Sequence, residues 1–180
     1  PILVDCDKDT WCMNVDEVKK KITKRTKAIL VVHMFGHPVD MDGIMSLAKE
    51  KGVFVIEDAA EAHGATYKNK KVGSFGDLAC FSFYANKLIT TGEGGMVLAN
   101  NKKLGERIRS LRNLGFKRER RFLHTEIGYN YRMTNIQAAL GVSQIEKIEE
   151  HVRIKRRNTK LYNDTLTKMS LPLRLPIEKD

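Results

Sequence analysis

Cysteine is scarce in this sequence of 180 residues, and the few cysteines form no recognisable site. There are three of them, Cys6, Cys12 and Cys80, which is an odd number without any C-x-x-C pair. This spacing argues against both a disulfide framework and a zinc finger. We therefore expect reduced thiols, as in a cytoplasmic protein.

Long apolar runs and phosphate-binding glycine motifs are also missing. No stretch approaches the roughly 20 apolar residues of a membrane-spanning helix. Gly92, Gly94 and Gly95 lie close together, but neither a G-x-G-x-x-G fingerprint nor a G-x-x-x-x-G-K-[ST] loop occurs. The composition, with 42% hydrophobic residues, predicts a globular domain with a substantial core.

Acidic residues are outnumbered. The 32 Lys and Arg residues against 22 Asp and Glu give a formal net charge of +10. Such a charge fits a nucleic acid, an anionic small molecule or simply a solvated basic surface. The basic runs lack interleaved aromatic residues and any known nucleic-acid motif, so we favour the solvated surface for most of these charges.

Strand and helix patterns alternate along the chain. Short apolar runs predict strands at residues 1–5, 27–36, 53–60, 78–84 and 95–100, and amphipathic or capped segments predict helices at residues 14–23, 41–52, 101–115 and 134–169. Asn14 with Glu17, and Thr134 with Gln137, have the spacing of a capping box. This order predicts an α/β fold with a mostly parallel sheet flanked by helices.

Three polar clusters follow predicted strands: "HMFGH" at 33–37, "EDAAEAH" at 57–63 and "SFYANK" at 82–87. Ligands of such sheets bind beyond the carboxyl ends of the strands. In the second cluster, Asp58, Glu61 and His63 with His33 could bind a divalent metal, as in a metal-dependent hydrolase. Alternatively, Asp58 could cap a helix N-terminus, or it could hold a protonated pyridine nitrogen.

Lys87 is the most informative residue of the third cluster, because no carboxylate lies within five positions of it. An apolar strand end would disfavour its charged form and leave a nucleophilic amine. An amine and an aspartate at neighbouring strand ends, with the Ser82 hydroxyl for a phosphate, suit pyridoxal 5′-phosphate (PLP). The competing interpretation of Lys87 alone is an exposed surface lysine.

Four longer segments carry a resemblance to a known family. "TKAILVVHMFG", "VIEDAAEAHGATYKNKKVGSFGD", "CFSFYANKLITTGEGGMV" and "GYNYRMTNIQAALG" are spread in family order over most of residues 1–160. The chain resembles the DegT/DnrJ/EryC1/StrS family of PLP-dependent nucleotide-sugar aminotransferases. The resemblance implies part of the large domain of an aspartate-aminotransferase-like (fold type I) enzyme.

The resemblance also implies roles for individual residues. Lys87 would form the Schiff base with PLP, Asp58 would contact the pyridine nitrogen, and Ser82 the phosphate; Glu61 also belongs to the cofactor site. Asn130 would reach the phosphate of the partner subunit, which implies a homodimer with shared active sites. We expect His33 and Arg132 to contact the substrate, although His33 also fits a purely structural role, and we expect no metal.

Within the family, the "FYANKLITTGEGGM" and "GYNYRMTNIQAALG" segments are most similar to those of GDP-perosamine synthases, although Ala85 replaces an expected glycine. The resemblance implies transfer of an amino group from glutamate to a keto-sugar nucleotide, GDP-4-keto-6-deoxymannose, in bacterial O-antigen biosynthesis. Another nucleotide sugar is the alternative. The basic loop at residues 116–124 could bind the diphosphate of that substrate or be an exposed loop.

The domain organisation follows from the same resemblance. We expect residues 1–133 to form part of the PLP-binding large domain without its N-terminal portion. We expect residues 134–180 to form a long helix leading towards a small C-terminal domain. The chain would then be a piece of a longer protein.

Overall fold

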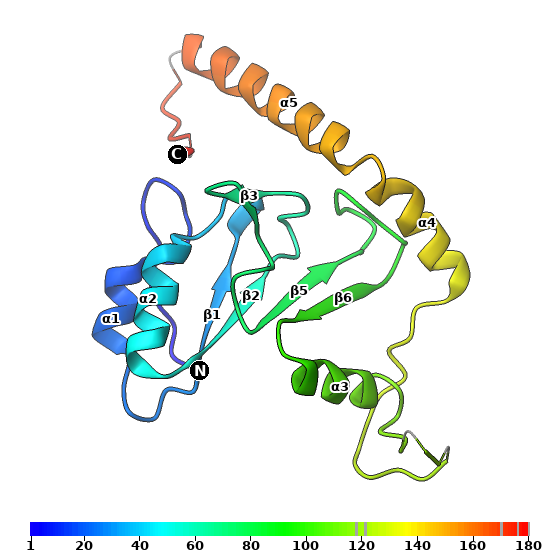
Figure 1. Ribbon diagram of the computed structural model, residues 1–180. Coiled ribbons are helices and arrows are strands. Elements are labelled where there is room, and N and C mark those ends of the chain that lie inside the picture. The colour runs from blue at the N-terminus through cyan, green and yellow to red at the C-terminus, as the bar shows by residue number, and fades with distance from the viewer. Residues whose placement is uncertain (118, 121, 170, 176, 180) are drawn as a thin grey trace.

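A four-stranded sheet forms the centre of the molecule, which we describe from a computed structural model covering residues 1–117, 119–120, 122–169, 171–175 and 177–179. Its strands are β1 (Ala28–Val32), β2 (Phe54–Asp58), β5 (Leu78–Ser82) and β6 (Gly95–Ala99), in the order β1-β2-β5-β6 (Figure 1). β1, β2 and β5 are parallel, and β6 is antiparallel to β5. A hairpin of β3 (Thr66–Tyr67) and β4 (Lys70–Lys71) lies apart from this sheet. The predicted α/β class and mostly parallel sheet are confirmed.

The core lies between the sheet and the first helices. α2 (Met41–Lys51) packs against β1 and β2, and α1 (Val15–Lys21) packs against α2. The buried apolar side chains between them are Val18, Ile29, Val31, Val39, Met41, Ile44, Leu47 and Val55. α2 begins at the Asp40 cap and ends at Gly52, whose φ of 63° suits a glycine C-cap.

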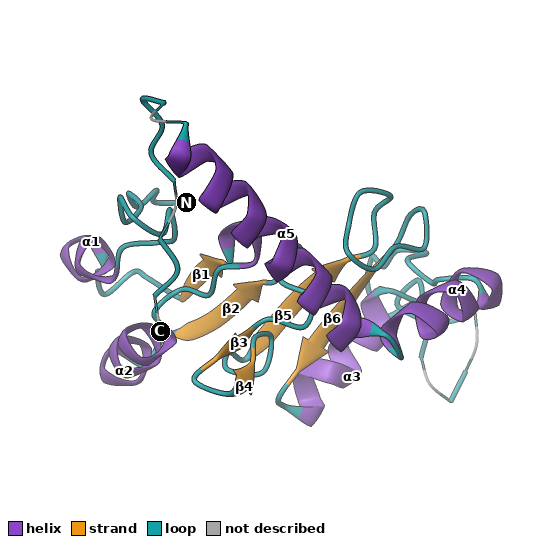
Figure 2. Ribbon diagram, turned by 90° about the horizontal axis from the view of Figure 1, so that it is seen from above, coloured by secondary structure: helices purple, strands orange, loops and turns teal. Residues whose placement is uncertain are grey.

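The remaining helices are α3 (Lys102–Leu111), α4 (Asn135–Ile145) and α5 (Ile148–Lys168). α5 crosses above the sheet on the side of the β3–β4 hairpin (Figure 2). An ion pair of 2.7 Å between Lys71 and Glu149 joins the hairpin to this helix. Among the described residues, none of the helices combines the length and apolar character needed to cross a bilayer.

A predicted strand and a predicted helix differ from the structure. Residues 1–5 form no strand, and Ile2 and Leu3 are 64% and 84% exposed, so their apolar character is not matched by a partner strand. The predicted helix at 101–115 ends at Leu111, because the carbonyls of Leu111 and Arg112 accept hydrogen bonds from the amides of Tyr129 and Tyr131.

The predicted helix at 134–169 is interrupted between Ile145 and Ile148. Its first half begins with the predicted capping box of Thr134 and Gln137. Near the interruption, the Gln144 amide bonds the backbone of Thr90 in both directions, at 3.0 and 2.7 Å. The chain therefore bends where hydrogen bonds join α4 to the glycine-rich loop at residues 90–95. The sequence between the two helices contains neither glycine nor proline.

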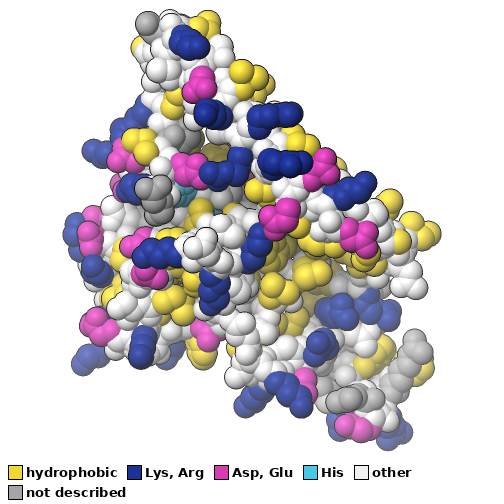
Figure 3. Space-filling model, turned by 45° about the horizontal axis from the view of Figure 1, so that its top comes forward, with side chains coloured by type: hydrophobic (Ala, Val, Ile, Leu, Met, Phe, Trp, Pro, Cys, Tyr) yellow, Lys and Arg dark blue, Asp and Glu magenta, His cyan; other side chains and the backbone are white. Residues whose placement is uncertain are grey.

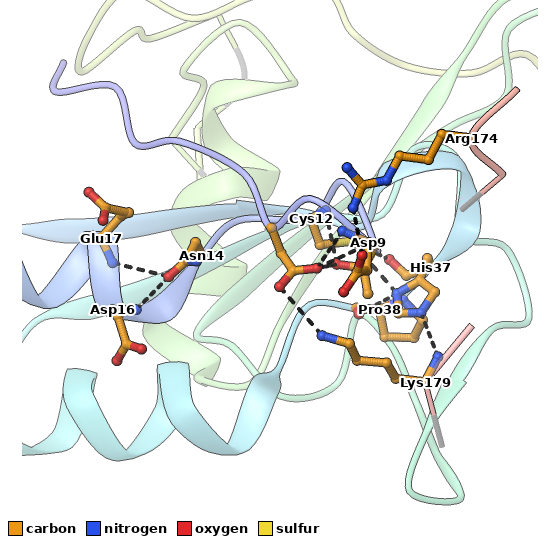
Figure 4. A network of polar contacts seen from close by, with 11 residues as sticks. Asp9, Cys12, Asn14, Asp16, Glu17, His37, Pro38, Arg174 and Lys179 are labelled. Carbon is orange, nitrogen blue, oxygen red and sulfur yellow. Dashed lines mark hydrogen bonds and ion pairs between the residues drawn. The ribbon is translucent and has the colours of Figure 1, made fainter. Parts of the chain in front are cut away.

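The C-terminal segment returns to the N-terminal loop (Figure 4). Arg174 pairs with Asp9 at 2.7 Å, the amide of Ile177 donates to the Asp9 carbonyl, and the amide of Lys179 donates to Nε2 of His37 at 3.3 Å. Nδ1 of His37 lies 2.9 Å from the Pro38 carbonyl. Since Sγ of Cys12 in the N-terminal loop also donates to the His37 carbonyl at 3.1 Å, His37 contacts both segments.

Candidate functional site

The ends of β1, β2 and β5 place the predicted residues side by side. Asp58 is the last residue of β2, Ser82 is the last residue of β5, and His33 follows β1. In the parallel register, Asp58 stands opposite Val32 of β1 and Cys80 of β5. The polar ends of neighbouring strands therefore meet at one edge of the sheet, as parallel strands require.

Lys87 acquires a carboxylate partner through the fold. Its Nζ lies 3.4 Å from Oε1 of Glu61, and its side chain is only 17% exposed. Oε2 of Glu61 accepts a hydrogen bond of 3.0 Å from the amide of Phe35. Phe35 has a φ of 52°, which is unusual for a bulky residue. Glu61 therefore joins the turn after β1 to the lysine of the third cluster.

Asp58 is held by the turn that follows its strand. Its Oδ1 accepts from the amide of Ala60 at 3.0 Å. Residues 59–65 form turns and no helix, so the alternative in which Asp58 caps a helix is wrong. The half-buried Asp58 carboxylate remains at the sheet edge, beside the strand end that carries Ser82.

The segment between Ser82 and β6 turns back on itself around Lys87. The Ser82 hydroxyl accepts from the amide of Tyr84 at 3.2 Å, and the amide of Lys87 donates to the Tyr84 carbonyl at 3.0 Å. Gly94 has a φ of 143°, and a Cβ there would lie 2.8 Å from the Thr91 hydroxyl. Glycine is thus required at this close approach.

Asn130 and Arg132 lie elsewhere. Their side chains are exposed and contact each other, with Arg132 Nε 3.4 Å from Asn130 Oδ1. The backbone around them is bonded to the end of α3, with the amide of Tyr131 donating to the carbonyl of Arg112. The structure therefore places Asp58 and Ser82 at neighbouring strand ends and joins Glu61 to Lys87, whereas Asn130 and Arg132 contact each other beside the end of α3.

This arrangement can be compared with known proteins. The whole chain, residues 1–180, matches the DegT/DnrJ/EryC1/StrS aminotransferase family. The chain belongs to this family. A GDP-perosamine synthase of Escherichia coli O157:H7 is 49% identical over 169 residues, which are 94% of this chain and 46% of that relative. The chain thus spans about half the length of the curated relatives that it matches.

Solved structures of the family have the same fold. An aminotransferase from Psychrobacter cryohalolentis superposes with a TM-score of 0.87 at 37% identity, covering 94% of this chain and 46% of that one. A GDP-4-keto-6-deoxymannose-3-dehydratase (ColD) variant with bound GDP-perosamine superposes with a TM-score of 0.85 at 27% identity, covering 91% of this chain and 47% of that one. The family fold is therefore shared by enzymes with different reactions.

His33 occupies a structural position in this family member. The residue has no exposed surface. Its Nε2 lies 3.1 Å from Oε2 of Glu57, and its Nδ1 accepts from the amide of Val39 at 3.2 Å. A buried ring with both nitrogens engaged cannot touch a substrate, so the prediction that His33 binds substrate is wrong.

The hydrogen bonds of the two His33 ring nitrogens also argue against the metal-site alternative. With both nitrogens used inside the protein, His33 does not join Asp58, Glu61 and His63 as a ligand. Within the described ranges, no three His, Cys, Asp or Glu side chains are close enough together to hold a metal ion. The geometry therefore does not support the hydrolase interpretation.

Glu57 is the structural residue that sequence reasoning missed. It immediately precedes Asp58, and the alternation of side chains in a strand turns it to the opposite face of β2. Its two oxygens accept hydrogen bonds of 2.6–2.8 Å from the amides of Gly73, Phe75 and Gly76. The signal was present in the sequence, because an acidic residue inside a buried strand requires partners.

Burial raises the pKa of the Glu57 carboxyl group, but the hydrogen bonds from His33 and the backbone amides outweigh burial, so the pKa lies below the ordinary value. A lowered pKa makes the charged form a source of stability. This contribution is present in full above the ordinary carboxyl pKa and is lost as the pH falls through the lowered value.

We therefore expect Glu57→Gln to lower the free energy of unfolding of the full-length protein at neutral pH by about 3 kcal/mol. The neutral amide lacks the buried negative charge that His33 and the three backbone amides stabilise. Urea denaturation measures this loss, which should shrink at acid pH. Glu50→Gln, which changes an exposed residue of α2, serves as the control and should have no measurable effect. Equal stability of the Glu57 variant and the wild type would contradict the assignment.

The basic surface shows no single concentrated patch on the face in Figure 3, where acidic side chains lie among the Lys and Arg side chains of α5. Ion pairs such as Arg156 with Glu178 at 2.5 Å occur along this helix. Arg118 and Arg121 of the basic loop at 116–124 lie outside the described residues. On this face, the mixed charges favour a solvated basic surface over a nucleic-acid interface.

Proposed function

We propose that the full-length protein is a PLP-dependent aminotransferase that transfers an amino group from glutamate to a nucleotide-linked keto-sugar. The observation that carries this proposal is the placement of Asp58 and Ser82 at adjoining strand ends, with Lys87 in the segment after Ser82 and 3.4 Å from Glu61 of the turn after Asp58. Three of these groups match the three parts of PLP: an amine can bond its aldehyde, a carboxylate can hold the proton on its pyridine nitrogen, and a hydroxyl can bind its phosphate. Membership of the aminotransferase family supports the same conclusion.

The residues present fit PLP in chemical type. Lys87 would bond the aldehyde carbon, Asp58 would hold the proton on the ring nitrogen, and the Ser82 hydroxyl would bind the phosphate. Glu61 would orient Lys87 through the contact already described. PLP, when bound, supplies an electron sink for the bonds of the carbon that carries the nitrogen.

Lys87 moves the proton in this proposal. With PLP bound, the Lys87 Nζ would act as the base that takes the α-proton of glutamate and would give a proton back to complete the transfer. In the second half of the reaction, the same amine would move a proton in the opposite direction for the keto-sugar. The partial burial of its side chain shields this transfer from water.

For the substrate, we propose GDP-4-keto-6-deoxymannose, with GDP-perosamine as the product, in bacterial O-antigen biosynthesis. The similarity to GDP-perosamine synthases supports this choice, and another nucleotide sugar is the alternative, since other sugar aminotransferases of the family also match. Arg132 would contact this substrate; the basic loop at residues 116–124 is a candidate for its diphosphate, with an exposed loop as the alternative. The three free thiols are consistent with a cytoplasmic enzyme.

A substrate panel tests this proposal. The full-length enzyme is supplied with glutamate and each of several GDP- and UDP-linked 4-keto-sugars, and 2-oxoglutarate formation is measured. We expect the largest kcat/KM for GDP-4-keto-6-deoxymannose. Preference for a UDP-linked sugar would overturn the substrate and keep the reaction, whereas no amino transfer to any sugar would overturn both.

We further propose a homodimer in which residues 1–133 belong to the large domain and residues 134–180 lead to the small one. The Asn130 side chain is exposed and contacts Arg132, and it would serve the phosphate site of the partner subunit. Arg132, which contacts it, would be carried to the same partner site.

Mixing two inactive variants tests the shared site. A Lys87→Ala subunit and an Asn130→Ala subunit can form a heterodimer with one intact site. We expect activity to return to about a quarter of the wild-type value if subunits exchange at random and sites act independently. Absence of recovery between subunits shown to exchange would place Asn130 outside the partner's site.

A further inference from the structure

His63 is buried next to the proposed site but has no role in the reaction described above. It lies in the turn after β2, five residues beyond Asp58, and is 6% exposed. Within the part of the chain that the structure describes, neither of its ring nitrogens has a hydrogen-bond partner. A buried polar group without a partner costs about 1–3 kcal/mol, so its presence calls for a reason.

The ring of His63 packs under the strand end that carries Ser82. Its centroid lies 5.6 Å from that of Phe81 and 5.9 Å from that of Phe83, the two residues that flank Ser82. Both aromatic rings therefore point to the side of the strand on which His63 lies, which fits the alternation of side chains along β5. His63 therefore lies beneath Ser82, on the side of the strand toward which Phe81 and Phe83 point.

The surroundings keep this imidazole neutral. Burial lowers the pKa of His63 more than the Ser82 backbone raises it, and the charge of Lys87 lowers it further. A neutral ring carries one N–H and one unprotonated nitrogen. The Ser82 backbone lies between the two aromatic residues that pack on His63 and raises its pKa, so we take the Ser82 carbonyl as the acceptor nearest to the N–H.

The opposite side of the turn is closed by α5. A Cβ on Gly64 would lie 2.8 Å from Cγ2 of Val152 and 3.0 Å from Cγ1 of Ile148. Gly64 also has a φ of 78°, so the turn is fixed both by its backbone and by the helix above it. Contact with α5 on one side and with Phe81 and Phe83 on the other therefore holds His63 against the strand end that carries Ser82.

We propose that His63 is a positioning residue whose N–H binds the Ser82 carbonyl when a phosphate occupies the Ser82 hydroxyl, and that it thereby fixes the phosphate end of the cofactor site. This inference rests on the proposed function. His63 should strengthen binding of the phosphate group and should not affect binding of the aldehyde or the ring of PLP.

The selectivity can be measured by comparing PLP with pyridoxal, which lacks the phosphate. Each is titrated into the full-length apoenzyme, and the dissociation constant is obtained from the visible absorbance. We expect His63→Phe, which keeps an aromatic ring without nitrogens, to weaken PLP binding about tenfold, as expected for loss of one hydrogen bond. Pyridoxal binding should not change.

Three further variants complete the experiment. Ser82→Ala should show the same selective loss, and His63→Asn or His63→Gln, which place an amide N–H near the positions of the two ring nitrogens, should recover PLP binding in at least one case. His151→Phe is the matched control, since Nδ1 of His151 is also buried without a partner among the described residues, and it should bind both compounds normally. If His63→Phe does not fold, His63→Leu replaces it with the same expected ratio.

The outcomes separate this inference from the proposed function. If wild-type enzyme binds PLP but His63→Phe weakens neither compound, or weakens both by the same factor, the positioning role is wrong and the function stands. If wild-type apoenzyme binds neither compound, the proposed function fails and the inference fails with it.

Discussion

Lys87→Ala is expected to lower the turnover of the full-length protein in the proposed amino transfer by about a thousandfold or more while the fold survives. In our proposal, Lys87 both bonds the cofactor and moves the proton, and a positioned base alone contributes about 10²–10⁴-fold. The fold should persist, because the substitution removes the 3.4 Å contact of the lysine with Glu61 while Glu61 keeps its bond to the amide of Phe35. Steady-state kinetics measures the loss, and circular dichroism checks the fold.

The matched control for this prediction is Lys103→Ala. Lys103 lies on α3 with an exposed side chain, so removing it changes the charge by the same amount away from the site. We expect unchanged turnover. Activity of Lys87→Ala close to that of the control would exclude Lys87 from the chemistry.

Asp58→Asn is expected to retain PLP but to raise the reaction barrier by about 3 kcal/mol or more, the size of large electrostatic effects in active sites. A neutral amide cannot hold the proton on the pyridine nitrogen, and so the electron sink is weakened. The substitution keeps the shape of the side chain. It also keeps an oxygen that can accept the hydrogen bond of 3.0 Å that the Ala60 amide donates to Asp58. The visible spectrum reports bound PLP, and kcat reports the barrier.

For this variant, Asp164→Asn on α5 provides the control, because that aspartate is exposed and belongs to another part of the molecule. It should leave kcat unchanged. An Asp58→Asn enzyme with normal kcat, or one that loses a bound metal while amino transfer continues, would contradict the role of Asp58.

The parts of the site that lie at strand ends could be predicted from the sequence. Short apolar runs locate β2 and β5, and the polar residues after such runs meet because parallel strands end at the same edge. Asp58 and Ser82 follow directly from this rule. The contact between Lys87 and Glu61 does not, since 26 residues separate them and the turn geometry decides their approach.

Other features depended on tertiary contacts that no local pattern reveals. His33 reads as a polar residue at a strand end, but its burial against Glu57 removes it from the site. The predicted helix at 134–169 has continuous helical periodicity, but the bond between Gln144 and Thr90 accompanies its interruption. His63 has no sequence signal beyond its place in the cluster, because its significance lies in unpaired nitrogens beneath Ser82.

The central claim is that Lys87 is the residue that bonds PLP, and borohydride reduction tests it most directly. Full-length enzyme is reduced, digested and analysed by peptide mass spectrometry, with an unreduced sample alongside. The account predicts that the visible absorbance disappears and that the mass of the reduced cofactor is found on the peptide containing Lys87. Attachment to a different lysine, or absence of any attached cofactor in an enzyme that catalyses amino transfer, would contradict it.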